Sequence, residues 1–309
     1  MKKLMLACAG LALSGAAIAA PNTECKTVRF ADVGWTDITA TTALASEVLE
    51  GMGYNPTANV LSVPVTYRSL KNKDIDVFLG NWMPTMEGDV RPYLESGDVE
   101  TVITNLEGAK YTLAVPQYVY DAGVTSFADI ATHADEFNDR IYGIEPGNDG
   151  NRLIQDMIDQ DAFGLGDFRV VESSEAGMLS QVSRATRRQQ WVVFLAWEPH
   201  PMNANHDLAY LDGGDDFFGP NYGGATVHTN VRKNYLEECP NVGKLLTNMT
   251  FSLTMENEVM GAILNDGEAP RDAAHAWLAS NPDVLDAWLE GVTTLDGNEA
   301  LPAVKASLK

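Results

Sequence analysis

The sequence predicts an α/β protein of two lobes, and three observations support this fold class. Strand-like and helix-like segments alternate along the chain, which is typical of helices packed on mostly parallel sheets. The alternation restarts near residue 127, as expected where a chain enters a second lobe. Two cysteines far apart in the chain, Cys25 and Cys239, are expected to pair, which would bring both ends of the chain into one lobe.

The lobe boundaries are expected where the chain crosses between the lobes, near Tyr111 and Asn205. A discontinuous first lobe would then contain residues 21–110 and 207–309, and the second lobe residues 111–206. The cysteine pair requires the same discontinuity. No internal repeat, low-complexity tract or long linker interrupts this plan.

The first part of the chain begins with a buried strand at 27–33. The helix after it carries apolar residues at helical spacing from Ile38 to Met52, and Gly53 follows its end. The segments expected next are strands at 60–65, 74–80, 100–103 and 111–115, and a helix at 85–96 that is interrupted near Pro92.

The second part repeats the alternation, and its most apolar segment is the strand expected at 191–196. The full set is helices at 127–137, 148–160 and 175–188, with strands at 140–144, 168–171 and 191–196. Short strands at 208–211 and 226–228 follow. From Val231 onward the chain is expected to be mostly helical, ending with a helix pair at 273–289.

Residues 1–20 read as an export signal. Two lysines precede an apolar run at 4–18 that is too short to span a bilayer, and Ala17-Ile18-Ala19 has the small-x-small pattern of a cleavage site. Cys8 would suit a lipoprotein, but too little apolar sequence precedes it. No second long apolar run follows, so we expect a soluble, exported protein.

The formal net charge is −22, which excludes some partners. A surface with this much negative charge repels phosphate backbones and anionic membranes. We therefore expect no nucleic-acid partner. The charge either serves solubility or attracts cations, and the sequence leaves both open.

Cys25 and Cys239 are the cysteines that remain after signal cleavage, and two cysteines in an exported protein usually pair. Closing so long a loop would stabilise the fold by roughly 4–5 kcal/mol in the chain-entropy account.

Three of the six tryptophans occupy equivalent positions. Trp35, Trp82 and Trp197 each come at the carboxyl end of an expected buried strand, beside a polar or Gly/Pro turn. Ligands of open parallel sheets bind at that edge, so we expect the three rings to share a site. Trp191 is expected at the opposite edge, and Trp277 and Trp288 in the core of the C-terminal helices.

Several aromatic faces around one pocket suit a cation that has no hydrogen-bond donors of its own. Four rings would contribute roughly 4–8 kcal/mol, whereas micromolar binding needs about 8. A nearby carboxylate would supply part of the rest. Asp37 is the candidate, although aspartate there is also a good N-cap for the following helix. Asn148 opens a later helix at a comparable strand end, as a site residue or only as a turn residue.

Four segments carry a family resemblance: DVGWTDI, DIDVFLGNWMPTM, PGNDGN and FLAWEPHPMN. They resemble the choline-binding branch of the periplasmic glycine betaine/choline solute-binding proteins of ABC importers, over about residues 28–288. The resemblance implies a type II-like periplasmic binding protein whose two hinged lobes close over a ligand in a central cleft. It also implies a periplasmic, non-enzymatic, monomeric protein that delivers its ligand to a permease in the inner membrane, without a metal or cofactor.

The family's aromatic box of three tryptophans and a tyrosine corresponds to Trp35, Trp82, Trp197 and Tyr111. Its aspartate and asparagine, which handle the charge and the alcohol of the ligand, correspond to Asp37 and Asn148. Tyr118 and Tyr120 compete with Tyr111 for the tyrosine position. Many betaine binders carry another aromatic residue where this chain has Pro201, a departure that favours choline.

Ligand charge favours choline as well, because the carboxylate of glycine betaine needs basic or N–H donors and is repelled by Asp37. Only Arg152 lies close in sequence. Glycine betaine, trimethylamine N-oxide, acetylcholine and carnitine remain alternatives, as does delivery to a chemoreceptor.

The alternative of a different class is an exported hydrolase. Its evidence is scattered: His200, His228 and the acidic residues Asp212, Asp215 and Asp216. No nucleophile or metalloprotease motif is present, and the acidic stretch lacks the ligand spacing of an EF-hand, so we expect neither a catalytic nor a metal site.

Overall fold

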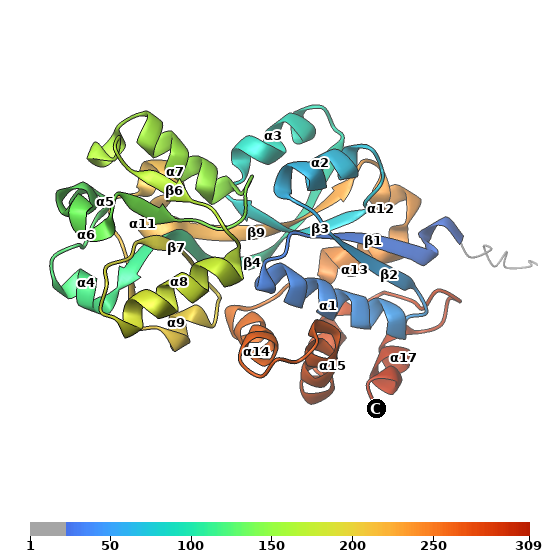
Figure 1. The fold of residues 1–309 in the computed structure, drawn as a ribbon. Coiled ribbons are helices and arrows are strands. Elements are labelled where there is room, and N and C mark those ends of the chain that lie inside the picture. The colour runs from blue at the N-terminus through green and yellow to red at the C-terminus, as the bar shows by residue number, and fades with distance from the viewer. Residues whose placement is uncertain (1–22) are drawn as a thin grey trace, which may run out of the picture.

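Nine strands form one mixed sheet that runs through the whole molecule in the computed structural model, which describes residues 23–309 (Figure 1). The strands are β1 (Thr27–Asp32), β2 (Asn55–Val60), β3 (Val77–Met83), β4 (Val99–Pro116), β5 (Arg140–Tyr142), β6 (Arg169–Val171), β7 (Phe194–Glu198), β8 (Leu208–Tyr210) and β9 (Gly224–Arg232). Their order is β2-β1-β3-β9-β4-β7-β5-β6, with β8 beside β4. The expected signal peptide, residues 1–20, lies outside the described residues.

Helices cover both faces of the sheet and divide into two lobes (Figure 1). Around β1, β2 and β3, here named the first lobe, are α1 (Thr36–Gly51), α2 (Val63–Lys71), α3 (Glu87–Glu95), α12 (Tyr235–Glu238), α13 (Pro240–Asn248), α14 (Leu253–Leu264), α15 (Pro270–Ser280), α16 (Val284–Trp288) and α17 (Ala300–Ser307). Around β5, β6 and β7, the second lobe, are α4 (Gln117–Asp121), α5 (Phe127–Ile130), α6 (Ala134–Phe137), α7 (Asp149–Asp159), α8 (Glu175–Arg187), α9 (Met202–Asn205), α10 (Asp215–Phe218) and α11 (Pro220–Gly223). The α/β two-lobed fold class is confirmed.

Within each lobe the outer strands are parallel, as expected, but the sheet as a whole is not mostly parallel. β1 pairs in parallel with β2 and β3, and β5 with β6 and β7. The four pairs made by β4 and β9 with their neighbours are antiparallel. These two long strands connect the lobes.

Strand β4 corrects the expectation of two short strands at 100–103 and 111–115. It is one strand of 18 residues whose pairing with β9 shifts register between Thr101 and Ile103, Thr104 and Leu106, and Leu106 and Ala109. The intervening polar residues look like a loop in sequence, but irregular pairing keeps them in the sheet.

The strand expected at 60–65 is also wrong. The true strand, β2, ends at Val60, and Val63 and Pro64 begin α2. β2 is mostly exposed at the edge of the sheet, so it lacks the apolar pattern by which buried strands are recognised.

Other boundaries differ from expectation. β3 and β7 are shifted towards the C-terminus relative to the strands expected at 74–80 and 191–196, and β9 is longer than the strand expected at 226–228. Helix α3 runs through Pro92 without a break. The helix expected at 127–137 is α5, a 3-10 turn (Ala131–His133) and α6. Because of the shifts of β3 and β7, Trp82 and Trp197 lie within the last residues of these strands rather than just after them.

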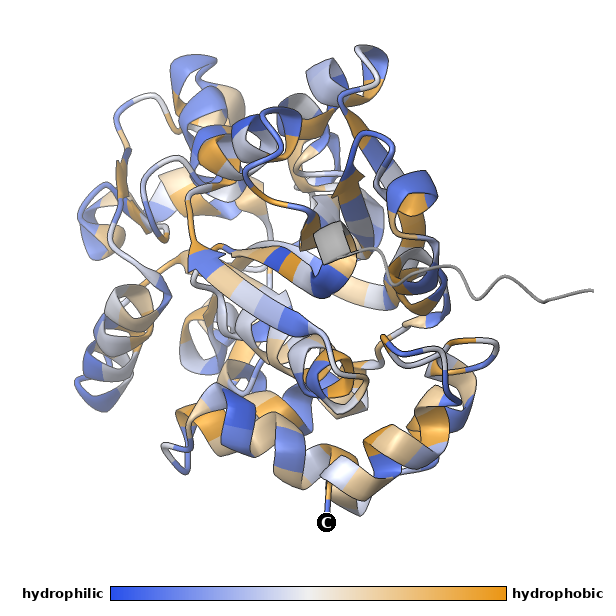
Figure 2. Ribbon diagram, turned by 90° about the vertical axis from the view of Figure 1, so that its right-hand side faces the viewer, coloured by the Kyte–Doolittle hydropathy of each residue, from blue (hydrophilic) through white to orange (hydrophobic). Residues whose placement is uncertain are grey.

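Helix α1 is the central helix of the first lobe and is buried on most of its surface. It lies against β1 and β3 on one side and against α14, α15 and α17 on the other. Its many small residues, among them Ala40, Ala43 and Ala45, allow this close approach. Figure 2 shows the apolar segments along the strands and on the inward faces of the helices, as burial of apolar area requires.

A disulfide joins Cys25 and Cys239, with the two Cα atoms 5.6 Å apart. Cys25 precedes β1, and Cys239 lies between α12 and α13, so the bond holds the N-terminal segment against the first lobe.

The residue boundaries of the lobes remain a prediction, and one stretch beyond Asn205 lies with the second lobe. β8 pairs with the end of β4, and Phe218 of α10 packs against Phe127 of α5 with ring centroids 5.9 Å apart. Among the residues that the structure describes, no helix is long and apolar enough to cross a membrane.

Candidate functional site

Three tryptophans come together where strands of the two lobes end. Trp35 lies between β1 and α1, and Trp82 and Trp197 are the next-to-last residues of β3 and β7. The sheet topology therefore brings two rings from the first lobe towards one from the second.

These rings line a narrow pocket, in and around which the space free of atoms amounts to about 240 Å³. Its lining consists of Trp35, Asp37, Trp82, Tyr111, Ile144 and Trp197. None of these residues is more than 6% exposed, so the cleft is closed. Ile144 is the one member that sequence reasoning missed. It ends the apolar strand expected at 140–144, so the strand-end argument applied to the tryptophans could have found it.

Tyr111 stands at the centre of the aromatic wall because of its register in the sheet. It pairs directly with Trp197 across β4 and β7, and their ring centroids are 6.2 Å apart at 81°. Its ring is 6.0 Å from that of Trp82 on another side. The competing tyrosines lie elsewhere: Tyr118 and Tyr120 are on α4, and the Tyr118 hydroxyl donates to the Gln190 carbonyl oxygen at 2.6 Å.

Asn148 supports Tyr111 from behind rather than lining the pocket. The Tyr111 hydroxyl donates to Asn148 Oδ1 at 2.9 Å, and the same oxygen caps α7 by accepting from the Asn151 backbone N–H at 3.1 Å. Gly150 leaves room for the Tyr111 hydroxyl group, since a Cβ at position 150 would lie 2.1 Å from the hydroxyl oxygen. Contact between Asn148 and a ligand alcohol remains a prediction.

Asp37 does not cap its helix, so that alternative is wrong. Trp35 occupies the N-cap position of α1, and no side chain makes a cap bond there. Instead, Asp37 Oδ2 accepts a hydrogen bond from Trp82 Nε1 at 3.1 Å, while Asp37 Oδ1 is buried without a partner among residues 23–309. Burial and the nearby charge of Glu175 raise the pKa of Asp37 to about 8. Such a carboxyl group favours a positive charge beside it.

Other acidic groups surround Asp37. Burial and the charge of Asp37 raise the pKa of Glu256 well above its usual range. Burial opposes ionisation of Glu175 too, but hydrogen bonding to His200 holds its pKa below the ordinary value. No lysine or arginine is among the lining residues, and the Arg152 guanidinium pairs with Asp89 at 2.5 Å instead. The pocket therefore offers acceptors and ring faces but no basic partner for an anion.

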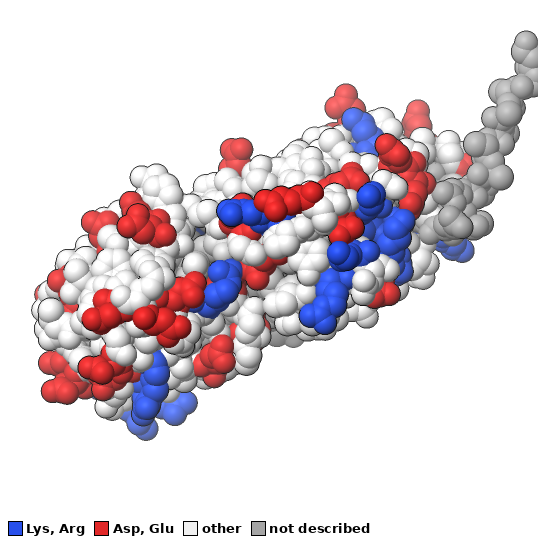
Figure 3. All heavy atoms as spheres, turned by 90° about the horizontal axis from the view of Figure 1, so that it is seen from above, with Lys and Arg blue, Asp and Glu red and all other residues white. Residues whose placement is uncertain are grey.

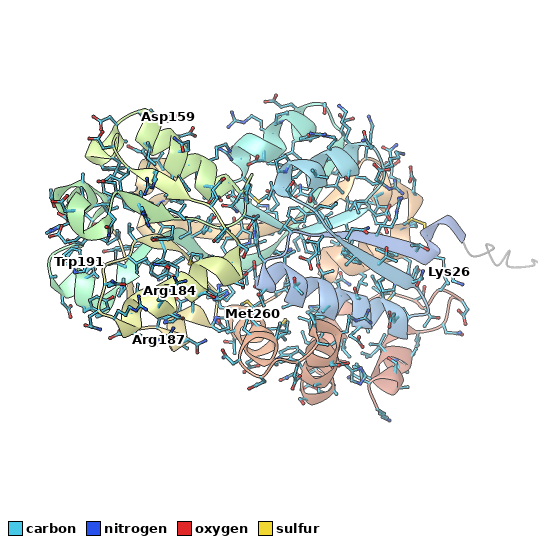
Figure 4. All side chains as sticks on the ribbon, in the orientation of Figure 1. Lys26, Asp159, Arg184, Arg187, Trp191 and Met260 are labelled. Atoms are coloured by element: carbon cyan, nitrogen blue, oxygen red, sulfur yellow. A yellow bond between two sulfur atoms is a disulfide. The ribbon has the colours of Figure 1, made fainter. Side chains whose placement is uncertain are left out.

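The remaining tryptophans lie outside the pocket. Trp288 is buried in the core, as expected, and its indole donates to the Thr250 carbonyl oxygen at 3.0 Å. Trp277 is only half-buried: it packs against the edge of the core, and its indole N–H donates to Glu258 at 2.7 Å. Trp191 precedes β7 and packs on Phe137 at the outer end of the second lobe (Figure 4).

The residues that suggested a hydrolase do not converge. His228 contacts Thr226 within β9, and Asp212 accepts from the backbone N–H of Gly213 in a turn. His200 pairs with Glu175, without a nucleophilic side chain in that pair. Within the described part of the chain, no group of three His, Cys, Asp or Glu residues is arranged to hold a metal ion.

Comparisons with known proteins give one consistent result. Residues 26–280 match the family model of the substrate-binding domain of ABC-type glycine betaine transport systems. An ABC-transporter choline-binding protein in complex with choline is 65% identical, with a TM-score of 0.92 over 93% of this chain and 99% of that one. An ABC-transporter choline-binding protein in an unliganded, semi-closed conformation has a TM-score of 0.85, at 65% identity over 92% of this chain and 99% of that one. Lactococcal OpuAC, in its closed form with glycine betaine, is 26% identical with a TM-score of 0.77 over 85% and 98%.

Proposed function

Because the chain belongs to the family of substrate-binding domains of ABC-type glycine betaine transport systems, we propose that its pocket captures choline for import. The observation that carries this proposal is the pocket lining: four aromatic rings and one buried carboxyl group, with no basic side chain. The likeness to a choline-bound protein at 65% identity supports it.

The trimethylammonium group of choline suits the rings. It has no N–H to donate, so its main interaction is with ring faces, which attract it at about 1–2 kcal/mol each when water is excluded. Trp35, Trp82, Trp197 and Tyr111 together supply roughly 4–8 kcal/mol, close to what micromolar binding requires.

The carboxyl group of Asp37 supplies the remainder and selects for net positive charge. Its unpartnered Oδ1 leaves one acceptor free beside the rings. A bound cation favours ionisation of Asp37 and takes the place of the proton that the buried group otherwise holds. The choline hydroxyl group can donate to this free acceptor. We prefer this contact to the one with Asn148 that the resemblance implies, because Asn148 Oδ1 already accepts from Tyr111 and Asn151.

Glycine betaine fits this chemistry less well. Its carboxylate would lie beside Asp37, with Glu256 nearby, and would find no lysine or arginine in the lining. One buried donor, Trp197 Nε1, has no partner within residues 23–309, and a single N–H does not balance a buried carboxylate.

The finer parts of the function follow from the same proposal. The signal-like residues 1–20 direct export to the periplasm, where the protein works as a monomer and hands choline to an inner-membrane permease. It acts by binding rather than by catalysis. We also propose the lobe division at about Tyr111 and at the start of β9, which assigns β8, α10 and α11 to the second lobe.

Titration calorimetry of the mature protein tests the proposal. We expect choline to bind most tightly in a series with acetylcholine, carnitine, glycine betaine and trimethylamine N-oxide. Tighter binding of glycine betaine than of choline would overturn the ligand assignment and leave the family membership intact.

A further inference from the structure

A second set of polar contacts joins the lobes beside the pocket. Glu175 of the second lobe accepts two hydrogen bonds from Thr36 of the first, one from the backbone N–H at 2.9 Å and one from the hydroxyl group at 2.5 Å. All three groups are buried in the closed molecule, and neither residue is among those that line the pocket.

The contact lies where two helices of different lobes meet at their N-terminal ends (Figure 1). Thr36 is the first residue of α1, and Glu175 is the first residue of α8. The first N–H groups of a helix have no acceptor within the helix, and no side chain of α1 caps its N-terminus. The carboxylate of Glu175 therefore caps α1 from the other lobe.

Contacts within the second lobe hold Glu175 in place for this role. His200 Nδ1 accepts from the Met202 backbone N–H at 2.9 Å, so its Nε2 carries the hydrogen that points to Glu175 Oε1 at 3.2 Å. The His200 ring also packs against Trp197, with centroids 4.9 Å apart. The carboxylate is thus fixed by the lobe that also presents Trp197 to the ligand.

We propose that Thr36 and Glu175 form a latch that holds the lobes closed and sets the rate at which ligand leaves. The proposal rests on the ligand-capture function above. Opening the cleft separates α1 from α8 and breaks both hydrogen bonds, which are charge-assisted and shielded from water while the cleft is closed. Thr36 and Glu175 are positioning residues: they act on closure and make no contact with the ligand.

Thr36→Val tests the latch, because valine keeps the shape and removes the hydroxyl donor. We expect about tenfold faster release of choline in stopped-flow chase experiments, an unchanged association rate and an unchanged melting temperature of the ligand-free protein. Thr36→Ser restores the donor and should return the release rate towards that of the native protein.

Thr39→Val is the matched control on the same helix. Its hydroxyl group donates to Asp32 at 2.8 Å, and both partners belong to the first lobe. This variant should lower the melting temperature with and without ligand and leave the release rate unchanged.

Glycine betaine, run in parallel, separates failure of the latch from failure of the choline assignment. A latch outside the pocket speeds release of any bound ligand by the same factor, so Thr36→Val should act alike on both. A native protein that binds only glycine betaine would refute the choline assignment. The latch would then be tested by comparing the rates at which the native protein and Thr36→Val release glycine betaine. A release rate within twofold of native, or a ligand-free melting temperature lowered as in Thr39→Val, would overturn the latch.

Discussion

Replacing Asp37 with Asn removes the one carboxyl group in the wall of the pocket and keeps the shape of the side chain. Asn can still accept the hydrogen bond from Trp82 Nε1. A cation about 4 Å from the carboxylate gains roughly 4 kcal/mol at an effective dielectric constant near 20. Releasing the proton at neutral pH from a group with a pKa of about 8 costs about 1.4 kcal/mol.

After this cost and part of the desolvation of the cation, a net contribution of about 1–2.5 kcal/mol remains. Choline affinity should therefore fall about 5- to 60-fold in Asp37→Asn. Glycine betaine should bind equally well or better, because its carboxylate no longer meets a neighbouring negative charge. Calorimetric titration of both ligands, native and variant, measures the two ratios.

Asp32→Asn serves as the control, since Asp32 is also buried, at the end of β1, but is absent from the lining. It binds Gly34 N–H and the Thr39 hydroxyl group, so its loss should reduce stability and leave the ratio of choline to betaine affinity unchanged. Small, equal changes for both ligands in Asp37→Asn would refute selection by charge.

Three further predictions follow from the same geometry. Trp35→Ala, Trp82→Ala and Trp197→Ala should each weaken choline binding at least tenfold in a folded protein. Trp288→Ala should instead lower the melting temperature and leave the affinity of the folded fraction unchanged. Equal losses of affinity in all four variants would contradict binding by the three pocket tryptophans. Choline affinity should rise between about pH 6 and 8 and level off above pH 8, because a proton on Asp37 competes with the cation and the pKa of Asp37 in the empty cleft is about 8. Titrations that give the same affinity across this pH range would contradict this competition. Denatured, unreduced mature protein should contain no free thiol in a thiol count, and two would contradict the Cys25–Cys239 disulfide.

Much of the fold could be predicted because buried strands and amphipathic helices leave strong periodic signals. These periodic signals are absent from strands that are mostly exposed or irregularly paired. β2 is a mostly exposed edge strand, and β4 keeps polar residues in the sheet through irregular pairing. Both need knowledge of the neighbouring strand, which local sequence does not contain.

The site was predictable to the extent that strand ends define it. Trp35, Trp82 and Trp197 could be placed together from their positions, whereas Tyr111 needed the family resemblance to separate it from Tyr118 and Tyr120. The contact of Glu175 with the other lobe could not be predicted, because glutamate is common in the first turn of a helix, where it interacts favourably with the helix dipole.

The net charge of −22 could serve solubility or the attraction of cations. The structure indicates that the acidic groups near the pocket serve the second purpose. Figure 3 shows acidic and basic side chains interspersed over one face of the molecule. Inside, by contrast, Asp37 and Glu256 are buried close to each other without a basic partner among the described residues. The acidity that concerns a ligand is therefore the acidity of the cleft.

A crystal structure of the mature protein with choline would show whether the aromatic rings hold the ligand. We expect the trimethylammonium group within about 6 Å of the ring centroids of Trp35, Trp82 and Trp197, with the hydroxyl group of choline next to the free oxygen of Asp37. Choline bound outside this pocket, or an empty pocket at saturating choline, would contradict it.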